Sequence, residues 1–199
     1  MPLPVLKESD PAMVEGLAGL LGQPALAKFF NLEEVVRRIV ATIDNLPRES
    51  YATRLNPVKP IGGLFIATGP DNNLAVAPAN AARYADFVKL AESVDSARAV
   101  GLYLRFYPLF QQAYRELGYP DGYFNDRLVD VIDHLLATPE VRGPIALVTP
   151  HVLYEYASAE LEERSAGQKA MLRMGPENAA RLKAKLRELR AELLRQAGR

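Results

Sequence analysis

The segment Asp95–Leu117 reads DSARAVGLYLRFYPLFQQAYREL and is the longest helix that the sequence predicts. Asp95 is a favourable N-cap, and Gly118 follows the segment as a favourable helix end. Apolar and aromatic residues cover most of its circumference: Val100, Leu102, Tyr103, Leu104, Phe106, Tyr107, Leu109, Phe110, Ala113, Tyr114 and Leu117. We therefore expect a buried central helix, kinked where Pro108 removes a hydrogen bond to Leu104.

The rest of the chain predicts a mainly α fold around this helix. Helical spacing and capping residues predict further helices over residues 10–21, 32–46, about 80–94, 158–163, 165–174 and 176–196. One more helix follows the turn at residues 119–122 and ends at about residue 137. Short β-prone runs predict one or two small β-hairpins, over 64–68 with 74–77 and over 145–148 with 152–156. We expect a single helical domain of about seven helices over residues 10–199, preceded by a tail or linker remnant at residues 1–9.

The composition excludes several classes of protein. The chain has 199 residues, no cysteine and 24 basic against 24 acidic residues. Without cysteine it has no disulfide framework, no thiolate nucleophile and no zinc site of the cysteine type. The balanced charge gives no overall attraction to nucleic acid, and no uncharged run is long enough to cross a bilayer. The composition is that of a globular protein with no visible signal peptide.

The segment Tyr119–Asp126, YPDGYFND, is the best candidate for a binding surface. It has turn chemistry and two tyrosines that we expect to be exposed, whereas the other aromatics nearby have the spacing of a core. Acidic residues and a histidine follow on one side of the next helix. The candidate surface comprises Tyr119, Asp121, Tyr123, Asn125, Asp126, Asp130 and His134.

Chemistry at these residues has competing interpretations. Asp130 and His134 are four residues apart, a spacing that suits two metal ligands but also a solvated acidic face, which we favour. His151 lies in a turn without an indicated partner, and no serine lies in a GxSxG motif. The polar run Asp44–Arg48 is either a binding corner or, as we favour, local capping of the backbone.

The last predicted helix carries a leucine stripe and a basic excess. Between Arg181 and Arg199 there are seven basic and two acidic residues. The stripe consists of Leu182, Leu186, Leu189 and Leu193. This pattern suits either a helix packed on its own domain with a basic, solvated back, which we favour, or a helix that docks a partner.

Several long and unusual strings lie along the chain. They are VATIDNLPR (40–48), PVKP (57–60), RFYP (105–108), YRELGYPDGYFND (114–126), SAGQ (165–168) and RMGPEN (173–178). Together they resemble the bacterial DUF3014 family, a domain of unknown function, over about residues 5–195. The resemblance implies a layout with one inner-membrane span, a proline-rich linker and then this domain on the periplasmic side. It supplies no catalytic residues.

This chain has no membrane segment. From the implied layout we therefore expect it to contact the membrane only through an anchor that is absent from this chain. We expect a non-enzymatic binding or scaffolding module of the bacterial cell envelope, without cofactor, whose partner is a protein or an envelope component and not nucleic acid. One alternative is a hydrolase or lyase that acts on a cell-wall or small-molecule substrate with Asp or Glu and Tyr or His in a cleft. Another is a self-associating module that forms homo-oligomers.

Overall fold

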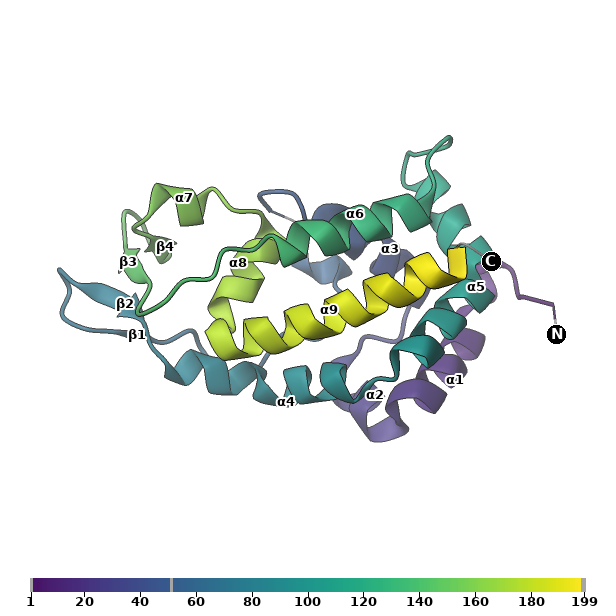
Figure 1. The fold of residues 1–199 in the computed structure, drawn as a ribbon, viewed down its shortest axis with the longest axis horizontal. Helices are drawn as coiled ribbons and strands as arrows, with labels where there is room; N and C mark the ends of the chain where they lie inside the picture. Colours follow the sequence, from purple (N-terminus) through teal and green to yellow (C-terminus); the bar gives the residue numbers. More distant parts are fainter. Residues whose placement is uncertain (1, 51, 198–199) are drawn as a thin grey trace.

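The computed structural model describes residues 2–50 and 52–197 and has a mainly helical fold, as predicted (Figure 1). The helices within these residues are α1 (Asp10–Leu21), α2 (Gln23–Phe29), α3 (Val35–Asn45), α4 (Ala79–Ser93), α5 (Ser96–Glu116), α6 (Phe124–Leu136), α7 (Ala159–Glu162), α8 (Ala166–Arg173) and α9 (Pro176–Ala197). Each of these helices except the short α2 corresponds to a range that the sequence predicted. None of these helices is long and apolar enough to cross a membrane.

The helix α5 runs unbroken through Pro108, and the bend expected there stays a prediction. The carboxylate of Asp95 caps it by accepting a hydrogen bond from the backbone N–H of Arg98 at 2.8 Å. Its buried residues include Val100, Phe106, Leu109, Phe110, Ala113 and Tyr114. Two residues predicted to be inward, Leu104 and Leu117, are exposed. Leu104 lies two positions before Phe106 and therefore on the opposite side of the helix.

The helix α9 lies across the helical body in Figure 1 and packs against α4, α5, α6 and α8. Its leucine stripe enters two apolar clusters. Leu182 packs beside Val88 of α4, and the other members of the stripe pack around Val100 and Ile132: Leu186, Leu189 and Leu193. The interpretation of a terminal helix packed on its own chain is therefore confirmed.

The N-terminal segment differs from the expected tail. Residues Leu6–Glu8 form a 3₁₀ turn, and both Leu6 and Ser9 are buried. Leu6 belongs to the main apolar cluster with residues of α1, α3, α5 and α6. Because Leu6 is buried, this segment packs on the domain. The prolines at positions 2 and 4 had favoured a tail here.

Asp10 is the first residue of α1, but its side chain binds the beginning of a different helix. Its carboxylate accepts hydrogen bonds from the backbone N–H groups of Glu34 and Val35, at 2.7 and 2.9 Å. Glu34 has a positive φ of 49°, and α3 begins only after it. The predicted start of this helix at residue 32 was therefore early, since the chain turns at Glu34.

Both predicted hairpins are present, and they join into one sheet. Its strands are β1 (Ala67–Thr68), β2 (Leu74–Val76), β3 (Ala146–Val148) and β4 (Glu155–Tyr156), in the order β1-β2-β3-β4 and all antiparallel. The two predicted hairpins join because Leu74 pairs with Leu147. The sheet lies at one end of the molecule (Figure 1), and its inner face packs on Leu172 of α8.

Candidate functional site

The turn between α5 and α6 is fixed from inside by a buried glutamine. The side-chain amide of Gln111 donates to the carbonyl of Gly122 at 2.7 Å, and its oxygen accepts from the backbone N–H of Phe124 at 2.9 Å. The hydroxyl of Tyr107 donates to the same oxygen at 2.9 Å. A Cβ at Gly122 would lie 3.1 Å from the ring of Tyr114, so this position favours glycine. The turn therefore has one well-determined conformation.

Tyr119 points into the molecule, against the prediction that it is exposed. Its ring stacks on that of Tyr114, with centroids 4.6 Å apart and 17° between the planes. Its hydroxyl donates a hydrogen bond to the carboxylate of Asp44 at 3.2 Å. The aromatic core thus extends into the turn and takes up this tyrosine.

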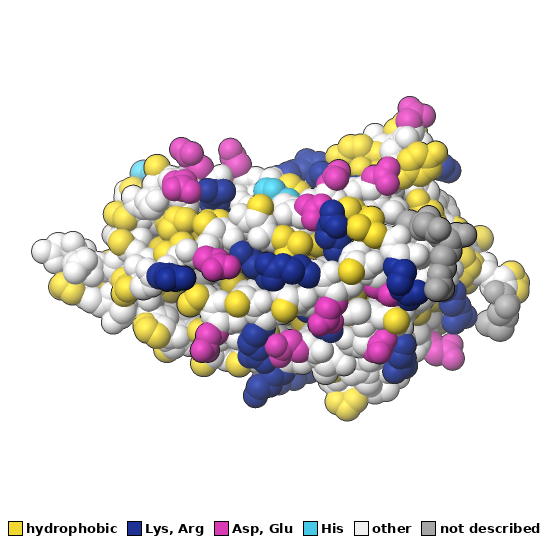
Figure 2. Space-filling view, in the orientation of Figure 1, with side chains coloured by type: hydrophobic (Ala, Val, Ile, Leu, Met, Phe, Trp, Pro, Cys, Tyr) yellow, Lys and Arg dark blue, Asp and Glu magenta, His cyan; other side chains and the backbone are white. Residues whose placement is uncertain are grey.

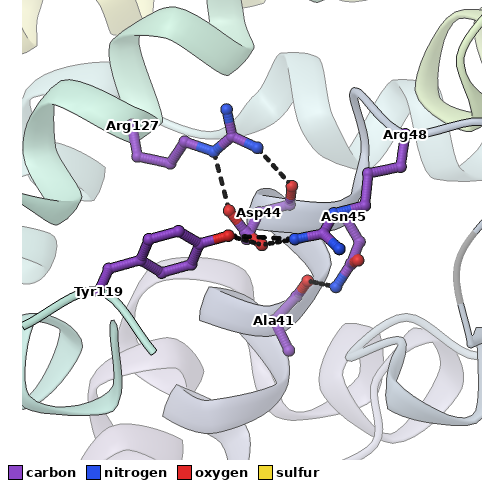
Figure 3. Close-up of polar contacts among 6 residues, drawn as sticks. All are labelled: Ala41, Asp44, Asn45, Arg48, Tyr119 and Arg127. Atoms are coloured by element: carbon purple, nitrogen blue, oxygen red, sulfur yellow. Dashed lines mark hydrogen bonds and ion pairs between the residues drawn. The ribbon is translucent and has the colours of Figure 1, made fainter. Parts of the chain in front are cut away.

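Asp44 of α3 is the centre of a polar cluster (Figure 3), although only 2% of its side chain is exposed. One carboxylate oxygen accepts from Arg48 at 2.7 Å and from Tyr119, and the other accepts from Nε of Arg127 at 3.0 Å. Arg127 also donates to the backbone carbonyl of Asp44 at 2.6 Å. Both carboxylate oxygens are thus engaged, and the cluster joins α3, the α5–α6 turn and α6.

The burial of the Asp44 carboxylate could have been predicted from the spacing of apolar residues in the sequence. Val36, Val40 and Asp44 are each four residues apart, so Asp44 continues the apolar face of α3. Neither interpretation of the run Asp44–Arg48 anticipated this, because Asp44 binds side chains of other elements. Local backbone bonding holds for Asn45, whose side chain donates to the carbonyl of Ala41 at 2.6 Å.

Beside this cluster, the end of α3 meets the beginning of α8. The backbone N–H groups of Ala166 and Gly167 donate to the carbonyls of Arg48 and Leu46, at 2.7 and 2.9 Å. A Cβ on Gly167 would lie 3.0 Å from that Leu46 carbonyl and 2.7 Å from a methyl of Leu135. Glycine is therefore needed at position 167, where the two backbones approach closely. The carbonyls at the end of α3 accept hydrogen bonds from N–H groups at the beginning of α8, and both sets lack partners within their own helices.

His134 lies next to this junction, with Nε2 2.7 Å from the hydroxyl oxygen of Ser165. That oxygen also accepts from the backbone N–H of Gln168 and so caps the beginning of α8. The side-chain amide of Gln168 donates to the carbonyl of His134 at 3.0 Å. Burial lowers the pKa of His134, and the positive charges of Arg127 and Arg164 lower it further. The neutral imidazole is therefore the form that this arrangement favours.

The outer side of the turn is open to solvent. Tyr123 is 63% exposed, and Asp121, Asp126 and Asp130 are exposed with it. Asn125 is half-buried and accepts a hydrogen bond from Tyr103 at 3.4 Å. Hydrophobic side chains gather over this turn at the upper right of Figure 2. We call Asp121, Tyr123, Asp126 and Asp130 the outer turn surface.

The predicted site residues thus lie in different environments. Four form the outer turn surface, Tyr119 faces inward, and Asn125 is partly covered. His134 lies ten residues beyond Phe124 in α6, about 15 Å along the helix axis, and binds α8 instead. Within residues 2–50 and 52–197, no group of three or more His, Cys, Asp or Glu side chains is placed to hold a metal ion.

Three basic residues of α9 are bound to neighbouring elements. Lys183 and Lys185 are buried and donate to the carbonyls of Thr138 and Val94, at 2.6 and 2.9 Å. Arg190 binds the carboxylate of Asp133 through two hydrogen bonds, at 2.6 and 2.8 Å. The predicted basic, solvated back of this helix is wrong for these residues, because they connect α9 to its neighbours.

Comparison with known proteins gives one match. No curated protein and no solved structure matches the chain. The model of a protein family of unknown function, DUF3014, matches residues 35–190. The matched range contains the Asp44 cluster, the outer turn surface and the contact between His134 and Ser165, and it begins later than the resemblance suggested. The chain belongs to the DUF3014 family.

Proposed function

We propose that this protein is a non-enzymatic binding or scaffolding module of the bacterial cell envelope, and that the outer turn surface contacts a partner protein. The observation that carries this proposal is the exposed ring of Tyr123 on a turn whose backbone is fixed by Gln111. The envelope setting is supported by the layout that the family resemblance implies.

A fixed, exposed tyrosine suits protein recognition for two reasons. Aromatic side chains, and tyrosine in particular, are enriched among the residues that dominate interface energies. A turn that is already ordered loses little conformational entropy when a partner binds it. Three exposed carboxylates, those of Asp121, Asp126 and Asp130, lie within seven residues of Tyr123 along the chain, and their negative charge favours a partner surface that carries lysine or arginine.

Photo-crosslinking tests this proposal. A photo-reactive amino acid is placed at position 123 in the full-length protein, expressed in its native host, and at position 152 as a control. Val152 is a suitable control because it is 96% exposed but lies near the sheet. We expect a discrete crosslinked partner from position 123 that is absent from position 152.

The identified partner then permits a quantitative test. Tyr123→Ala should weaken its binding by at least about 10-fold, whereas Val152→Ala should leave it unchanged. Paired Asp121→Asn and Asp126→Asn substitutions should slow association and reduce its dependence on salt. Failure to obtain a discrete product from position 123, or full affinity of the Tyr123→Ala variant, would contradict the proposal.

The enzyme alternative has one observation in its favour, the 2.7 Å contact between His134 and Ser165. Such a pair resembles a base and a nucleophile. Ser165, however, is 6% exposed and its oxygen caps α8, so helix capping accounts for the contact. Ser165→Ala separates the two interpretations: loss of a cap lowers the melting temperature, whereas loss of a nucleophile abolishes a hydrolytic activity in the unchanged fold.

A further inference from the structure

We propose that a second copy of this chain pairs with the free edge of strand β1, in an antiparallel arrangement about Ala67. The small sheet has two edges, and they differ in how they are protected. Strands at a sheet edge expose unpaired backbone groups and are usually covered, charged, interrupted by proline or bulged. Only the β4 edge of this sheet has such a cover within the described residues.

The edge at β4 is closed by a carboxylate. The backbone N–H of Tyr156 points away from β3 and donates to the side chain of Glu162, in α7, at 2.8 Å. Glu162 is itself held by Lys169 at 2.9 Å. An incoming strand would have to displace this ion pair, so the β4 edge is unsuited to pairing.

The edge at β1 is open. The carbonyl of Ile66 accepts from the backbone N–H of Ala77, so Ile66 faces the neighbouring strand. Because backbone groups alternate along a strand, the N–H and C=O of Ala67 point away from β2. Residues 60–70, PIGGLFIATGP, contain no charged side chain and no proline between their ends.

This edge is also fixed in position. The buried side chain of Asn80 accepts from the N–H of Ile66 at 3.0 Å and donates to its carbonyl at 2.6 Å. Arg83 donates to the carbonyls of Ile61, Gly62 and Gly63, at 3.4, 3.0 and 2.7 Å. An already ordered strand pairs at a lower entropic cost than a mobile one.

The chemistry of the edge favours a second copy as its occupant. A two-fold axis beside Ala67 would place each copy's Ala67 opposite the other, so that the two residues exchange N–H···O=C bonds. Ile66 would then lie opposite Thr68 of the other copy, and Leu64 opposite its Pro70. Leu64 is 88% exposed, and Ile66 is also exposed, so pairing covers apolar surface. Because residues 60–70 carry no charged side chain, this pairing places no like charges of the two strands directly opposite each other.

Sedimentation velocity over a concentration series that reaches the millimolar range tests this pairing in the intact chain. We expect a monomer–dimer equilibrium that Ile66→Lys and Ala67→Pro shift to monomer. Lysine places a charge on the edge, and proline removes the free N–H without touching the bonds to β2. Val152→Lys is the control, since it places the same charge on an exposed apolar side chain outside residues 60–70, and should leave the dimer intact.

Amide hydrogen exchange assigns the contact to this edge. The Ala67 N–H should exchange more slowly in the dimer than in dilute monomer, whereas the Tyr156 N–H should exchange equally in both. A wild-type chain that stays monomeric would overturn the proposal. So would a dimer that Ile66→Lys leaves intact, or one in which Ala67 exchange does not slow. Circular dichroism verifies that each variant is folded.

Discussion

The two sides of the α5–α6 turn contrast in how their polar groups are used. On the inner side, the hydroxyl of Tyr119 and the carboxylate of Asp44 bind each other and two arginines. On the outer side, Tyr123, only four residues from Tyr119, is exposed together with Asp121. Proximity in sequence therefore does not imply a shared role: the inner groups hold three elements together, and the outer groups are free for a partner.

This contrast predicts that substitutions on the inner side change stability and that those on the outer side change binding. The largest effect is expected for Asp44→Ala. It removes the only carboxylate of the cluster and leaves Arg127, with 27% of its side chain exposed, unpaired near the core. Removing one partner of a buried ion pair costs about 3–5 kcal/mol. Chemical denaturation of the purified chain measures the loss.

Arg48→Ala is the matched control for that variant. More than half of the Arg48 side chain is exposed, and Asp44 keeps Arg127 and Tyr119 as partners without it. Its loss should cost on the order of 1 kcal/mol. Equal losses for Asp44→Ala and Arg48→Ala would show that the buried carboxylate is not the centre of the cluster.

The second largest effect on the inner side is expected for Gln111→Ala. This change leaves the N–H of Phe124 without its acceptor and the carbonyl of Gly122 without its donor. A buried group left unsatisfied costs about 1–3 kcal/mol. Gln112→Ala is the control, because Gln112 is exposed and binds only Glu116 of its own helix. A stable Gln111→Ala variant would mean that the turn is not fixed from inside.

Much of the fold follows from local sequence patterns, whereas the site depends on contacts between distant residues. The periodicity of α5, the cap at Asp95 and the β-prone runs predicted these elements because each signal lies within a few residues. The joining of the hairpins through Leu74 and Leu147 is a contact between segments over 70 residues apart, and no local pattern encodes it.

The same distinction explains the errors at the site. The exposed position of Tyr123 was predicted from turn chemistry alone. The inward position of Tyr119 depends on Asp44 of another helix, 75 residues earlier. The burial of Asp44 could be predicted from its position on the apolar face of α3. No sequence pattern indicated that Arg127 would be its partner. A charged residue at core spacing is thus worth treating as a predicted buried ion pair.

A smaller effect on stability is expected from pH, through His134 at the junction of α6 and α8. Its pKa is lowered in the folded protein, so the unfolded chain binds a proton at a higher pH than the folded chain does. The resulting stability is present above the ordinary histidine pKa of about 6.5 and is lost as the pH falls through it. Denaturation between about pH 7.5 and pH 5.5 should show this loss, and it should be reduced in His134→Gln.

The chain offers a matched control, since His151 is its other histidine and is exposed. The His151→Gln variant makes the same substitution at an exposed position and is measured beside it. If His134→Gln keeps the wild-type dependence of stability on pH, burial of the His134 ring is not the cause of that dependence.

The smallest effect on stability is expected for Tyr123→Ala, which is the strongest test of the contrast. The side chain is 63% exposed, so its removal should change the free energy of unfolding by no more than about 0.5 kcal/mol. Tyr119→Ala, in contrast, removes a stacked ring and a hydrogen bond to a buried carboxylate and should cost several times more. Parallel denaturation curves of the two variants give the comparison directly. A loss at Tyr123 as large as that at Tyr119 would make both tyrosines structural, and the outer turn surface would then have no residue reserved for a partner.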